Sequence, residues 1–394
     1  MSYPNVIIKN KRVDAIKRRH PWIFSGAIHS KPSNLKDGDV VCVIDNQENH
    51  LATGQYHNGS IMVRVLTFED VLIDQKFWNA KINKAYTYRS TLQLTKNDNT
   101  NAYRLIHGEG DGMSGLIIDI YDLHAVVQCH SIGMYRSIDM IIAALEHVYE
   151  GSLKAIYVKS GNSLPSSYDA YPGDYFAKGD AEQAVIIENG VKFQINWVKG
   201  QKTGFFLDQR ENRKLLGAMS SVKSVLNCFC YTGGFSMYAM ANNAEKVHSV
   251  DVSAYAMELV EENYKLNDFK IDHQTEAKNV MTMFSDESLS KYDIVIVDPP
   301  AFAKSVKKRH NAVQAYKRLN IMALKNVKKG GFLFTFSCSQ VVDTALFNNT
   351  IRSAAIESGK EIQVVKYLSQ GPDHPVNIYH PEGSYLKGLV LKVG

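Results

Sequence analysis

The chain has 394 residues, of which 45% are hydrophobic and 22% charged, and its formal net charge is +5. This length exceeds that of one ordinary domain and predicts two or three compact units. No stretch approaches the roughly 18 consecutive apolar residues of a membrane span, and the N-terminus MSYPNVIIKN lacks the apolar core of a signal peptide. We therefore expect a soluble, cytoplasmic, globular protein with no membrane partner.

The cysteines are too scattered for a disulfide framework, and their number is odd. Only two lie close together in the sequence, and no second pair stands at the spacing of a zinc site, so no metal site is expected. Free thiols remain, and one of them could act as a nucleophile. The cysteines are Cys42, Cys129, Cys228, Cys230 and Cys338.

The range 1–72 predicts a small β-barrel, because apolar runs at 40–45 and 60–68 alternate with turn signals. In the preceding segment RRHPWIFSGAI, Trp22 and Phe24 interleave with cationic side chains, which is typical of nucleic-acid contacts. A plain barrel core explains these aromatic residues equally well. Basic residues near this segment suit either a phosphate backbone or a solvated face: Lys9, Lys11, Arg12, Lys17, Arg18 and Arg19.

The range 73–184 predicts an α+β domain. A helical pattern near 76–95 precedes the glycine-rich stretch 108–129, whose two apolar runs indicate a β-hairpin, and 134–149 has the period of an amphipathic helix. The glycines lack the Lys-Ser/Thr ending of a phosphate-binding loop, so we interpret them as turns.

The range 185–394 opens with a predicted β-hairpin, after which strands and helices alternate. Alternation with near-continuous apolar strands is typical of a parallel, doubly wound α/β sheet. Ligands of such sheets bind at the carboxyl ends of the strands. The strands are expected within 224–230, 246–252, 293–300, 331–339, 361–368 and 384–393.

The first two of these strands end in residues that suit a nucleoside. Gly233 and Gly234 let the backbone approach a ligand closely, while the dinucleotide fingerprint G-x-G-x-x-G is absent. Asp251 ends the second strand, where an acid can accept hydrogen bonds from ribose hydroxyls; a helix N-cap is the alternative. Together they predict a nucleoside ligand without a pyrophosphate, and S-adenosylmethionine is the common ligand of that kind.

The next strand ends in Asp298-Pro299-Pro300. Two prolines make a rigid corner with two fewer N–H donors, which could hold the Asp298 carboxylate against the edge of a flat base. Cys338 ends the strand after that. A lone cysteine is usually a small core residue, but at a strand end the dipole of the following helix would favour its thiolate.

Five stretches together resemble the RlmI-type 23S ribosomal RNA 5-methylcytosine methyltransferases, and the N-terminal part resembles their PUA domain. The resemblance spans nearly the whole chain. Its motifs are specific in combination and weak singly. The stretches are KTGFFLDQRENR (202–213), NCFCYTGGFS (227–236), VDPPAF (297–302), FTFSCS (334–339) and HPEGSYLKG (380–388).

The resemblance implies a PUA domain at 1–72, an α+β middle domain at 73–184 and a Rossmann-like class I methyltransferase domain at 185–394 that uses S-adenosylmethionine. It also implies that Cys338 and Asp298 are catalytic. The residues expected to bind the cofactor are Asn227, Phe229, Tyr231, Thr232, Gly233, Gly234, Asp251, Asn279 and Asp298.

Two positions depart from the family pattern. Asn279 stands where an acidic residue often lies near the adenine of the cofactor, which leaves the adenine contacts open. Ala301 follows the Pro-Pro corner, where related enzymes with two catalytic cysteines carry one of them, so Cys338 would have to act alone.

The expected substrate is 23S ribosomal RNA or its large-subunit precursor, and a homodimer is a further expectation. A target base must leave its stack to reach the crevice, and polar or cationic side chains near the crevice suit RNA. The expected RNA contacts are Lys202, Gln209, Arg210, Pro299, Pro300, Phe302 and Lys304, with Arg18 and Arg19 in the N-terminal part.

Three functions remain open at this point. The first is methylation of cytosine carbon 5 through a covalent Cys338 adduct. The second is methylation of a base amine, which Asp-Pro-Pro with a nearby aromatic residue would also suit, although it leaves Cys338 idle. The third is a non-catalytic RNA-binding assembly factor, against which the intact Gly233, Gly234, Asp251 and Asp298 argue.

Overall fold

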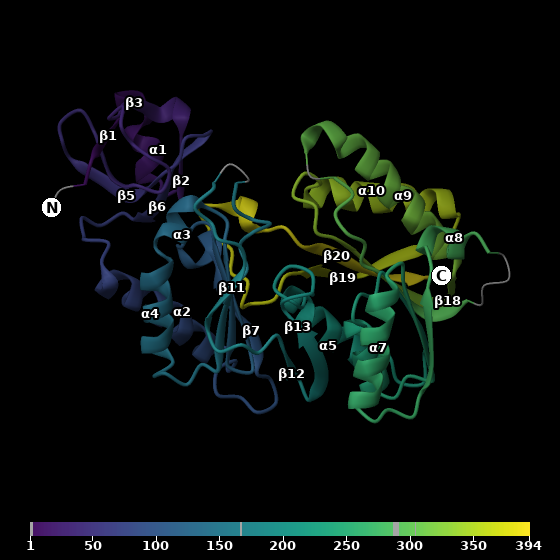
Figure 1. Ribbon diagram of the computed structural model, residues 1–394. Coiled ribbons are helices and arrows are strands. Elements are labelled where there is room, and N and C mark those ends of the chain that lie inside the picture. Colours follow the sequence, from purple (N-terminus) through teal and green to yellow (C-terminus); the bar gives the residue numbers. More distant parts are fainter. Residues whose placement is uncertain (1–2, 166–167, 287–290, 304) are drawn as a thin grey trace. The chain divides into compact units, whose positions relative to one another are not determined.

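The computed structural model describes residues 3–165, 168–286, 291–303 and 305–394 (Figure 1). No described helix is long and apolar enough to cross a membrane. The chain forms two compact units, and each takes residues from separate parts of the sequence. The first unit comprises 1–187, 195–207 and 372–383, and the second comprises 188–194, 208–371 and 384–394.

The first unit begins with a six-stranded sheet in the order β2-β6-β5-β4-β1-β3. Only β1 and β4 pair in parallel; the other neighbours are antiparallel. Valines at alternate positions of β4 and β6 point into one hydrophobic core that also contains Ile23. The elements are β1 Asn5–Ile8, α1 Val13–Lys17, β2 Trp22–Phe24, β3 Ile28–Ser30, β4 Val40–Ile44, β5 His50–Tyr56 and β6 Ile61–Thr67.

A five-stranded sheet in the order β11-β10-β9-β8-β7 follows in the same unit. Strands β8 and β9 form the hairpin expected within 108–129, and the apolar faces of α2 and α4 pack into the core of this sheet. The elements are α2 Gln75–Thr91, β7 Ala102–His107, β8 Leu116–Tyr121, β9 His124–Cys129, α3 Ile132–Arg136, α4 Ile138–Val148, β10 Ala155–Val158 and β11 Tyr175–Lys178.

The late segment 372–383 belongs to this first unit although it follows most of the second unit in the sequence. Asp373 anchors it, because its carbonyl accepts a 2.7 Å hydrogen bond from Arg89 and its carboxylate accepts a 3.0 Å bond from the backbone N–H of Arg104. Arg89 is fully buried and also pairs with Asp111 at 2.8 Å. Buried charge-assisted bonds of this kind fix the segment in place.

The second unit contains a seven-stranded sheet in the order β16-β15-β14-β17-β18-β20-β19. Strands β14 to β18 pair in parallel, and β20 is antiparallel to both of its neighbours. The chain order reverses between β14 and β17, which makes that edge the topological switch point. The strands are β14 Ser224–Cys228, β15 Lys246–Asp251, β16 Asp272–Ala277, β17 Tyr292–Val297, β18 Val327–Ser337, β19 Ile362–Ser369 and β20 Lys387–Val393.

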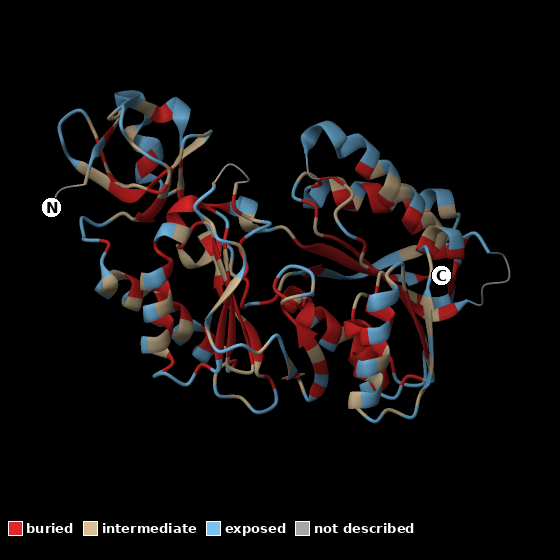
Figure 2. Ribbon diagram, in the orientation of Figure 1, coloured by how far each residue is buried: buried red, intermediate tan, exposed pale blue. Residues whose placement is uncertain are grey.

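Helices cover both faces of the seven-stranded sheet, whose five inner strands are largely buried while the edge strands β16 and β19 are not (Figure 2). Helices α8, α9 and α10 share one hydrophobic core with the strands, and α9 and α10 run side by side (Figure 1). Helices α6 and α7 pack on β14, β15 and β16. The helices are α5 Arg210–Met219, α6 Gly234–Ala241, α7 Ala254–Leu266, α8 Val280–Phe284, α9 Arg309–Lys325 and α10 Thr344–Ser358.

The structure forms each of the six strands expected for the doubly wound sheet, and the predicted hairpin before them is β12 Gln183–Glu188 with β13 Val191–Asn196. The sheet also has an edge strand, β16, whose sequence DHQTEA is polar. The three-domain boundaries at 72 and 184 stay predictions.

Candidate active site

The register of the parallel strands brings the predicted motifs to one edge of the sheet. Cys228 lies opposite Val250 on one side and Val297 on the other, and Val297 lies opposite Thr335. Asp251 and Asp298 therefore each stand one residue beyond this row, and Cys338 stands three residues beyond it. The carboxyl ends of parallel strands at a switch point are where such sheets bind ligands.

The loop after β14 has a constrained backbone. Phe229, Tyr231 and Gly233 have φ angles of 57°, 48° and 78°, and this left-handed region is costly for the two aromatic residues. A Cβ added to Gly233 would lie 3.1 Å from the Val260 side chain, so another residue would be crowded as well as strained at this φ. Strain of this kind persists where surrounding contacts hold it, and it is common at ligand sites.

Asp251 joins this loop to the end of β15. Its carboxylate accepts hydrogen bonds from the backbone N–H groups of Tyr231, at 3.1 Å, and Ser253, at 3.0 Å. The N-cap of α7 is Ser253, whose side chain accepts from Ala256, so the alternative of Asp251 as a helix cap is wrong. Asp251 is only half-buried, and a carboxylate has about four acceptor positions, which leaves capacity for a ligand.

Two buried side-chain atoms near the glycine turn have no hydrogen-bond partner among the described residues. They are Asn227 Oδ1 and Thr232 Oγ1, although Asn227 donates to Ser236 at 2.9 Å. Unpaired buried polar atoms are rare in native proteins and are expected where a polar ligand completes the set. With Asp251 and the close-approach position Gly233, these residues fit S-adenosylmethionine.

Asn279 has a defined structural role. It is the N-cap of α8, and its side-chain oxygen accepts from the backbone N–H groups of Met281 and Thr282 at 2.9 and 3.3 Å. Only its exposed amide nitrogen is left to contact an adenine. Its assignment to the cofactor stays a prediction.

Asp298 is held by a chain of side-chain hydrogen bonds. Gln209 Nε2 donates to Asp298 Oδ2 at 2.9 Å, and Gln209 Oε1 accepts from Asn212 Nδ2 at 2.6 Å. Asn212 also donates to the carbonyl of Ser369 at 3.1 Å. Because Gln209 is 2% exposed, these bonds fix its amide and, through it, the carboxylate.

The loop after Cys338 is tied to the loop after Asp298. Ser339, which is buried, donates from its hydroxyl to the carbonyl of Ala303 at 2.9 Å. Lys387 Nζ donates to the carbonyls of Ser339 and Val342, both at 2.6 Å. The two loops therefore cannot shift independently, and a buried cation stands close to the half-buried Cys338.

The phenol of Tyr316 is affected by both Cys338 and Asp298. Burial raises the pKa of Tyr316 to about 12, and the negative charges of Cys338 and Asp298 add to that increase. Burial lowers the pKa of Lys387, while the attraction of Cys338 and Asp343 raises it. A thiolate at Cys338 would therefore interact with the buried phenol of Tyr316 and with the ammonium group of Lys387.

The structure separates the residues expected to contact RNA. Gln209 and Arg210 are buried, with exposures of 2% and 1%. Their side chains therefore lie in the interior of the second unit and not on a surface that RNA could contact. Phe302 packs on Tyr316 with ring centroids 4.7 Å apart. Lys304 lies outside the described residues. The exposed members of the set are Arg18, Arg19, Lys202 and Pro300, and Pro299 is buried.

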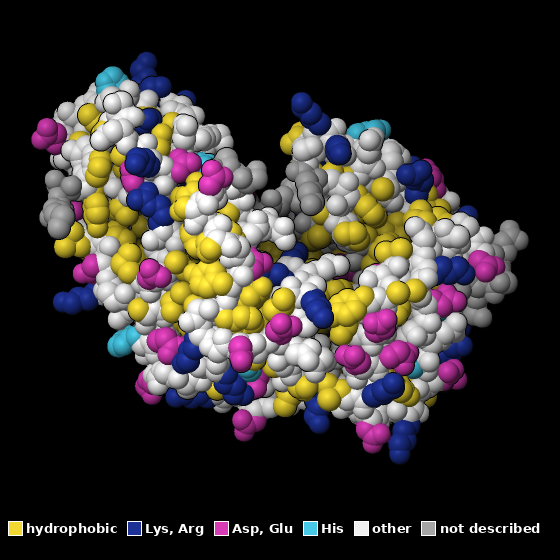
Figure 3. All heavy atoms as spheres, viewed as in Figure 1, with side chains coloured by type: hydrophobic (Ala, Val, Ile, Leu, Met, Phe, Trp, Pro, Cys, Tyr) yellow, Lys and Arg dark blue, Asp and Glu magenta, His cyan; other side chains and the backbone are white. Residues whose placement is uncertain are grey.

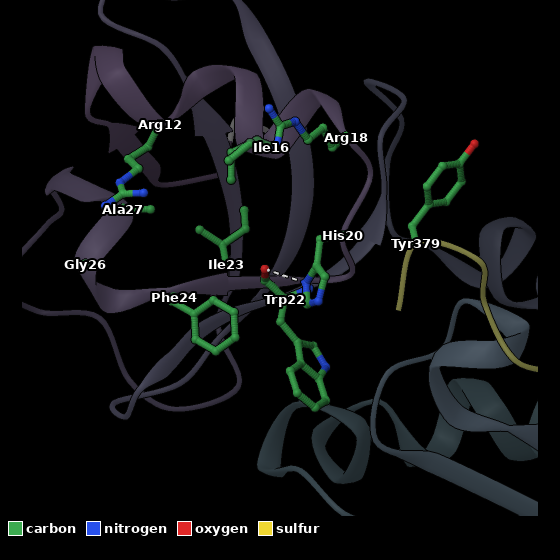
Figure 4. Close-up of a pocket in the computed structure, with 11 residues that line it drawn as sticks. Arg12, Ile16, Arg18, His20, Trp22, Ile23, Phe24, Gly26, Ala27 and Tyr379 are labelled. Atoms are coloured by element: carbon green, nitrogen blue, oxygen red, sulfur yellow. Dashed lines mark hydrogen bonds between the residues drawn. The ribbon is translucent and has the colours of Figure 1, made fainter. Parts of the chain in front are cut away.

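A pocket of about 590 Å³ lies in the first unit beside β2 (Figure 4). Ile23 of β2 points into the sheet core, whereas Trp22 and Phe24 point away from it, so the expectation of a plain barrel core does not hold for these two aromatic residues. Phe24 is 48% exposed. Arg18 and Tyr379 also line the pocket, and Lys and Arg side chains are scattered over the visible surface of the N-terminal sheet (Figure 3).

Comparison with known proteins decides the family. A family model described as S-adenosylmethionine-dependent methyltransferase matches residues 168–389. The chain belongs to this family. The methyltransferase also matches a PUA-like domain model at residues 6–68, as its N-terminal sequence predicted, and S-adenosylmethionine is its cofactor.

Curated relatives confirm the resemblance seen in the motifs. A ribosomal RNA large subunit methyltransferase I from Pseudoalteromonas atlantica is 37% identical to this methyltransferase, and the match covers 97% of each chain. One of the same name from Klebsiella pneumoniae is 33% identical and covers 99% of this chain and 98% of its own.

Solved structures share the fold over the whole length. A protein described as a methyltransferase complexed with SAH has a TM-score of 0.85 at 24% identity and covers 100% of both chains. A protein from Streptococcus mutans, described as SAM-dependent, has a TM-score of 0.83 at the same identity and coverage. The predicted α/β fold class is confirmed.

Sequence reasoning did not assign Asn212, Ser339 or Lys387 to the site. Each lies inside a stretch that carried the family resemblance, namely 202–213, 334–339 or 380–388. Membership of these stretches was the available signal in the sequence. The hydrogen bonds to Ser369, Ala303 and Val342 that place these side chains in the site cross long distances in the chain and cannot be read from it.

Proposed function

We propose that this methyltransferase forms 5-methylcytosine in 23S ribosomal RNA through a covalent bond between Cys338 and carbon 6 of the target cytosine. The shared name of the curated relatives supports large-subunit ribosomal RNA as the substrate. The observation that carries the chemistry is the hydrogen bond from Ser339 to Ala303, which couples the loop of the thiol to the loop of the Asp298 carboxylate.

Methylation at carbon 5 requires a nucleophile because this carbon is part of an aromatic ring. In the proposed reaction the Cys338 thiolate forms a bond to carbon 6, and the displaced π electrons make carbon 5 nucleophilic. S-adenosylmethionine, when bound, supplies the electrophilic methyl group that carbon 5 accepts. A base then takes the carbon-5 proton, the electron pair left behind restores the ring double bond, and the bond to Cys338 breaks to return the thiolate.

Asp298 would act at the edge of the base. Addition at carbon 6 places negative charge on the ring. A hydrogen bond at N3 stabilises that charge, either donated by Asp298 in its protonated form or accepted by its carboxylate from a proton carried on N3. The bond from Gln209 fixes the orientation of the Asp298 carboxyl group, and we propose that this group contacts the base. Lys387 would favour the thiolate of Cys338 by its positive charge.

The cofactor would lie against the strained loop and the end of β15. We propose that the Asp251 carboxylate accepts from the ribose hydroxyls and that Thr232 and Asn227 contribute the unpaired polar atoms. Gly233, with its φ of 78°, would form the tight turn that carries the backbone past the ligand.

RNA would be held by both charge and stacking. Arg18 and Arg19 are exposed and suit phosphates, while Phe24 and Trp22 present aromatic surface at the pocket of the first unit. Lys202 is exposed as well. Substitution of these residues would weaken RNA binding more at low salt than at high salt and would reduce its salt dependence, because fewer counterions are released when phosphate contacts are lost.

Replacement of Cys338 tests the proposal. Cys338→Ala should lower methyl transfer to ribosomal RNA by at least about a thousandfold and leave the calorimetric affinity for S-adenosylmethionine within a factor of about two. Cys42→Ala is the matched control, since Cys42 is also a half-buried thiol but belongs to the N-terminal sheet. RNA that contains 5-fluorocytidine should form a covalent complex with the wild-type protein and with Cys42→Ala, but not with Cys338→Ala.

Two results would contradict the proposal. Full methyl transfer by Cys338→Ala would eliminate the covalent mechanism. Recovery of a base N-methylated on its exocyclic amine, identified by mass spectrometry of the nucleosides, would assign the crevice to amine methylation instead.

A further inference from the structure

A cluster of three side chains of metal-ligand type lies in the first unit. His20 immediately precedes the Pro21 that leads into β2, and His380 and Glu382 belong to the late segment 372–383. One ligand atom of each lies within 4.8 Å of the others. The Nε2 atoms of both histidines lie 3.9 Å from the same Glu382 carboxylate oxygen.

His380 supplies an independent sign of a missing ligand. It is buried, with 3% of its surface exposed, and neither of its ring nitrogens has a hydrogen-bond partner among the described residues. Buried polar atoms are normally paired. At 3.9 Å its distance to Glu382 is too long for a hydrogen bond, so a shared proton does not satisfy it.

The surroundings of His20 favour a ligand role. Its Nδ1 atom lies 3.1 Å from the carbonyl oxygen of Trp22 (Figure 4). A metal-bound histidine usually donates its second ring N–H to such a carbonyl, which leaves the other nitrogen for the ion. The same Nδ1 atom is 3.1 Å from the backbone nitrogen of Trp22, whose N–H could donate to it. That contact requires the tautomer in which Nδ1 carries no proton, whereas the bond to the carbonyl requires a proton on Nδ1. Metal binding at Nε2 would favour the tautomer with the proton on Nδ1.

We propose that His20, His380 and Glu382 bind one divalent transition-metal ion, and that zinc is the ion their ligand types favour. Two imidazoles and a carboxylate are a common zinc ligand set, with bonds of about 2.0–2.2 Å. Ligand atoms on one ion therefore stand up to roughly 4 Å apart. The cluster has to contract slightly, and the Glu382 side chain, which is 59% exposed, is free to move.

The ion would join the N-terminal sheet to segment 372–383. His380 already packs on Trp22, with ring centroids 4.3 Å apart, and Trp22 in turn donates to Glu109 at 2.9 Å. A metal bond between these parts would brace Trp22 in the wall of the pocket. The cysteine pattern gave no sign of this site, because its ligands are histidines and a glutamate separated by most of the chain.

Metal titration of the full-length protein tests the site. After treatment with a chelator, ZnCl2 titrated in a calorimeter should bind as a single ion per chain, and CoCl2 should give the visible absorption bands of a tetrahedral site. His20→Ala and His380→Ala should each weaken binding by more than about a hundredfold, since even the loss of an outer partner of a ligand weakens metal binding about 10- to 100-fold.

His57→Ala is the matched control. His57 belongs to the N-terminal sheet region and contacts Asp37 at 3.3 Å, outside the cluster, so this variant should bind zinc as the wild type does. Circular dichroism and thermal melting without metal would show that each variant is folded. Absence of a bound ion in the wild type, or equal binding by His380→Ala, would overturn the proposal; the second result would mean an adventitious ion only.

Discussion

Gln209 should be essential to the placement of the Asp298 carboxylate. Its amide nitrogen donates to Asp298 at 2.9 Å, and its amide oxygen accepts from Asn212 at 2.6 Å. Gln209→Leu keeps the volume and removes both bonds. Asn212 retains its hydrogen bond to the carbonyl of Ser369, so the change is confined to the carboxylate.

The size of the effect follows from the charge of Asp298. A hydrogen bond to a charged group contributes about 1.5–3 kcal/mol, and each 1.4 kcal/mol is about a factor of ten in rate. If that bond orients the carboxylate in the transition state, kcat for methyl transfer should fall about ten- to a hundredfold. The affinity for S-adenosylmethionine should change little, because the side-chain hydrogen bonds described for Gln209 go to Asp298 and Asn212 rather than to the loop after β14.

Single-turnover methyl transfer to ribosomal RNA, together with calorimetric binding of the cofactor, separates the two effects. Gln274→Leu is the control, since Gln274 is exposed on the edge strand β16. A Gln209→Leu enzyme that is as fast as the Gln274→Leu enzyme would refute the role assigned to this network. A variant that loses cofactor affinity and rate equally would point to general damage of the fold.

Three further predictions concern the same unit. Asp251→Ala should weaken S-adenosylmethionine binding in a calorimeter by about ten- to a hundredfold, because two hydroxyl bonds to a charged acceptor are lost. Lys387→Met should slow the alkylation of Cys338 by iodoacetamide several-fold, because a neighbouring cation stabilises the reactive thiolate by on the order of 1 kcal/mol. For Asp293, partial burial acts to raise the pKa, but hydrogen bonds from Ser224 and Lys328 outweigh it and lower the pKa to about 2. This carboxylate should therefore stabilise the fold above its unfolded pKa of about 4 and lose that effect as the pH falls toward 2; urea unfolding of Asp293→Asn should show a deficit of about 1 kcal/mol at pH 7 that disappears at low pH.

Most of the doubly wound sheet was predictable because its inner strands are buried on both faces. Strand β17, for example, has four consecutive buried apolar residues, and a continuous apolar run of this kind indicates a parallel strand. Among the described residues, strand β16 lies at the edge of the sheet and pairs with β15 on one side. It needs little apolar surface, so its sequence DHQTEA gave no signal.

The site was predictable only where chain position determines it. Asp251, Asp298 and Cys338 follow strands, and the ends of parallel strands meet at one edge whatever the details of packing. The side chains that orient them come from elsewhere: Gln209 is 89 positions before Asp298 in the chain. From its sequence context, a polar residue such as Gln209 would be expected to be exposed. Its burial depends on tertiary contacts that the sequence does not show.

Segment 372–383 has a consequence for biosynthesis. Synthesis proceeds from the N-terminus, and domains generally begin to fold as they emerge. The buried Arg89 and the backbone N–H of Arg104 can donate their hydrogen bonds to Asp373 only after almost the whole chain has left the ribosome. The first unit is therefore the earliest part to be made and among the last to be completed, and a fragment that stops before residue 372 would leave Arg89 with only part of its buried hydrogen bonds.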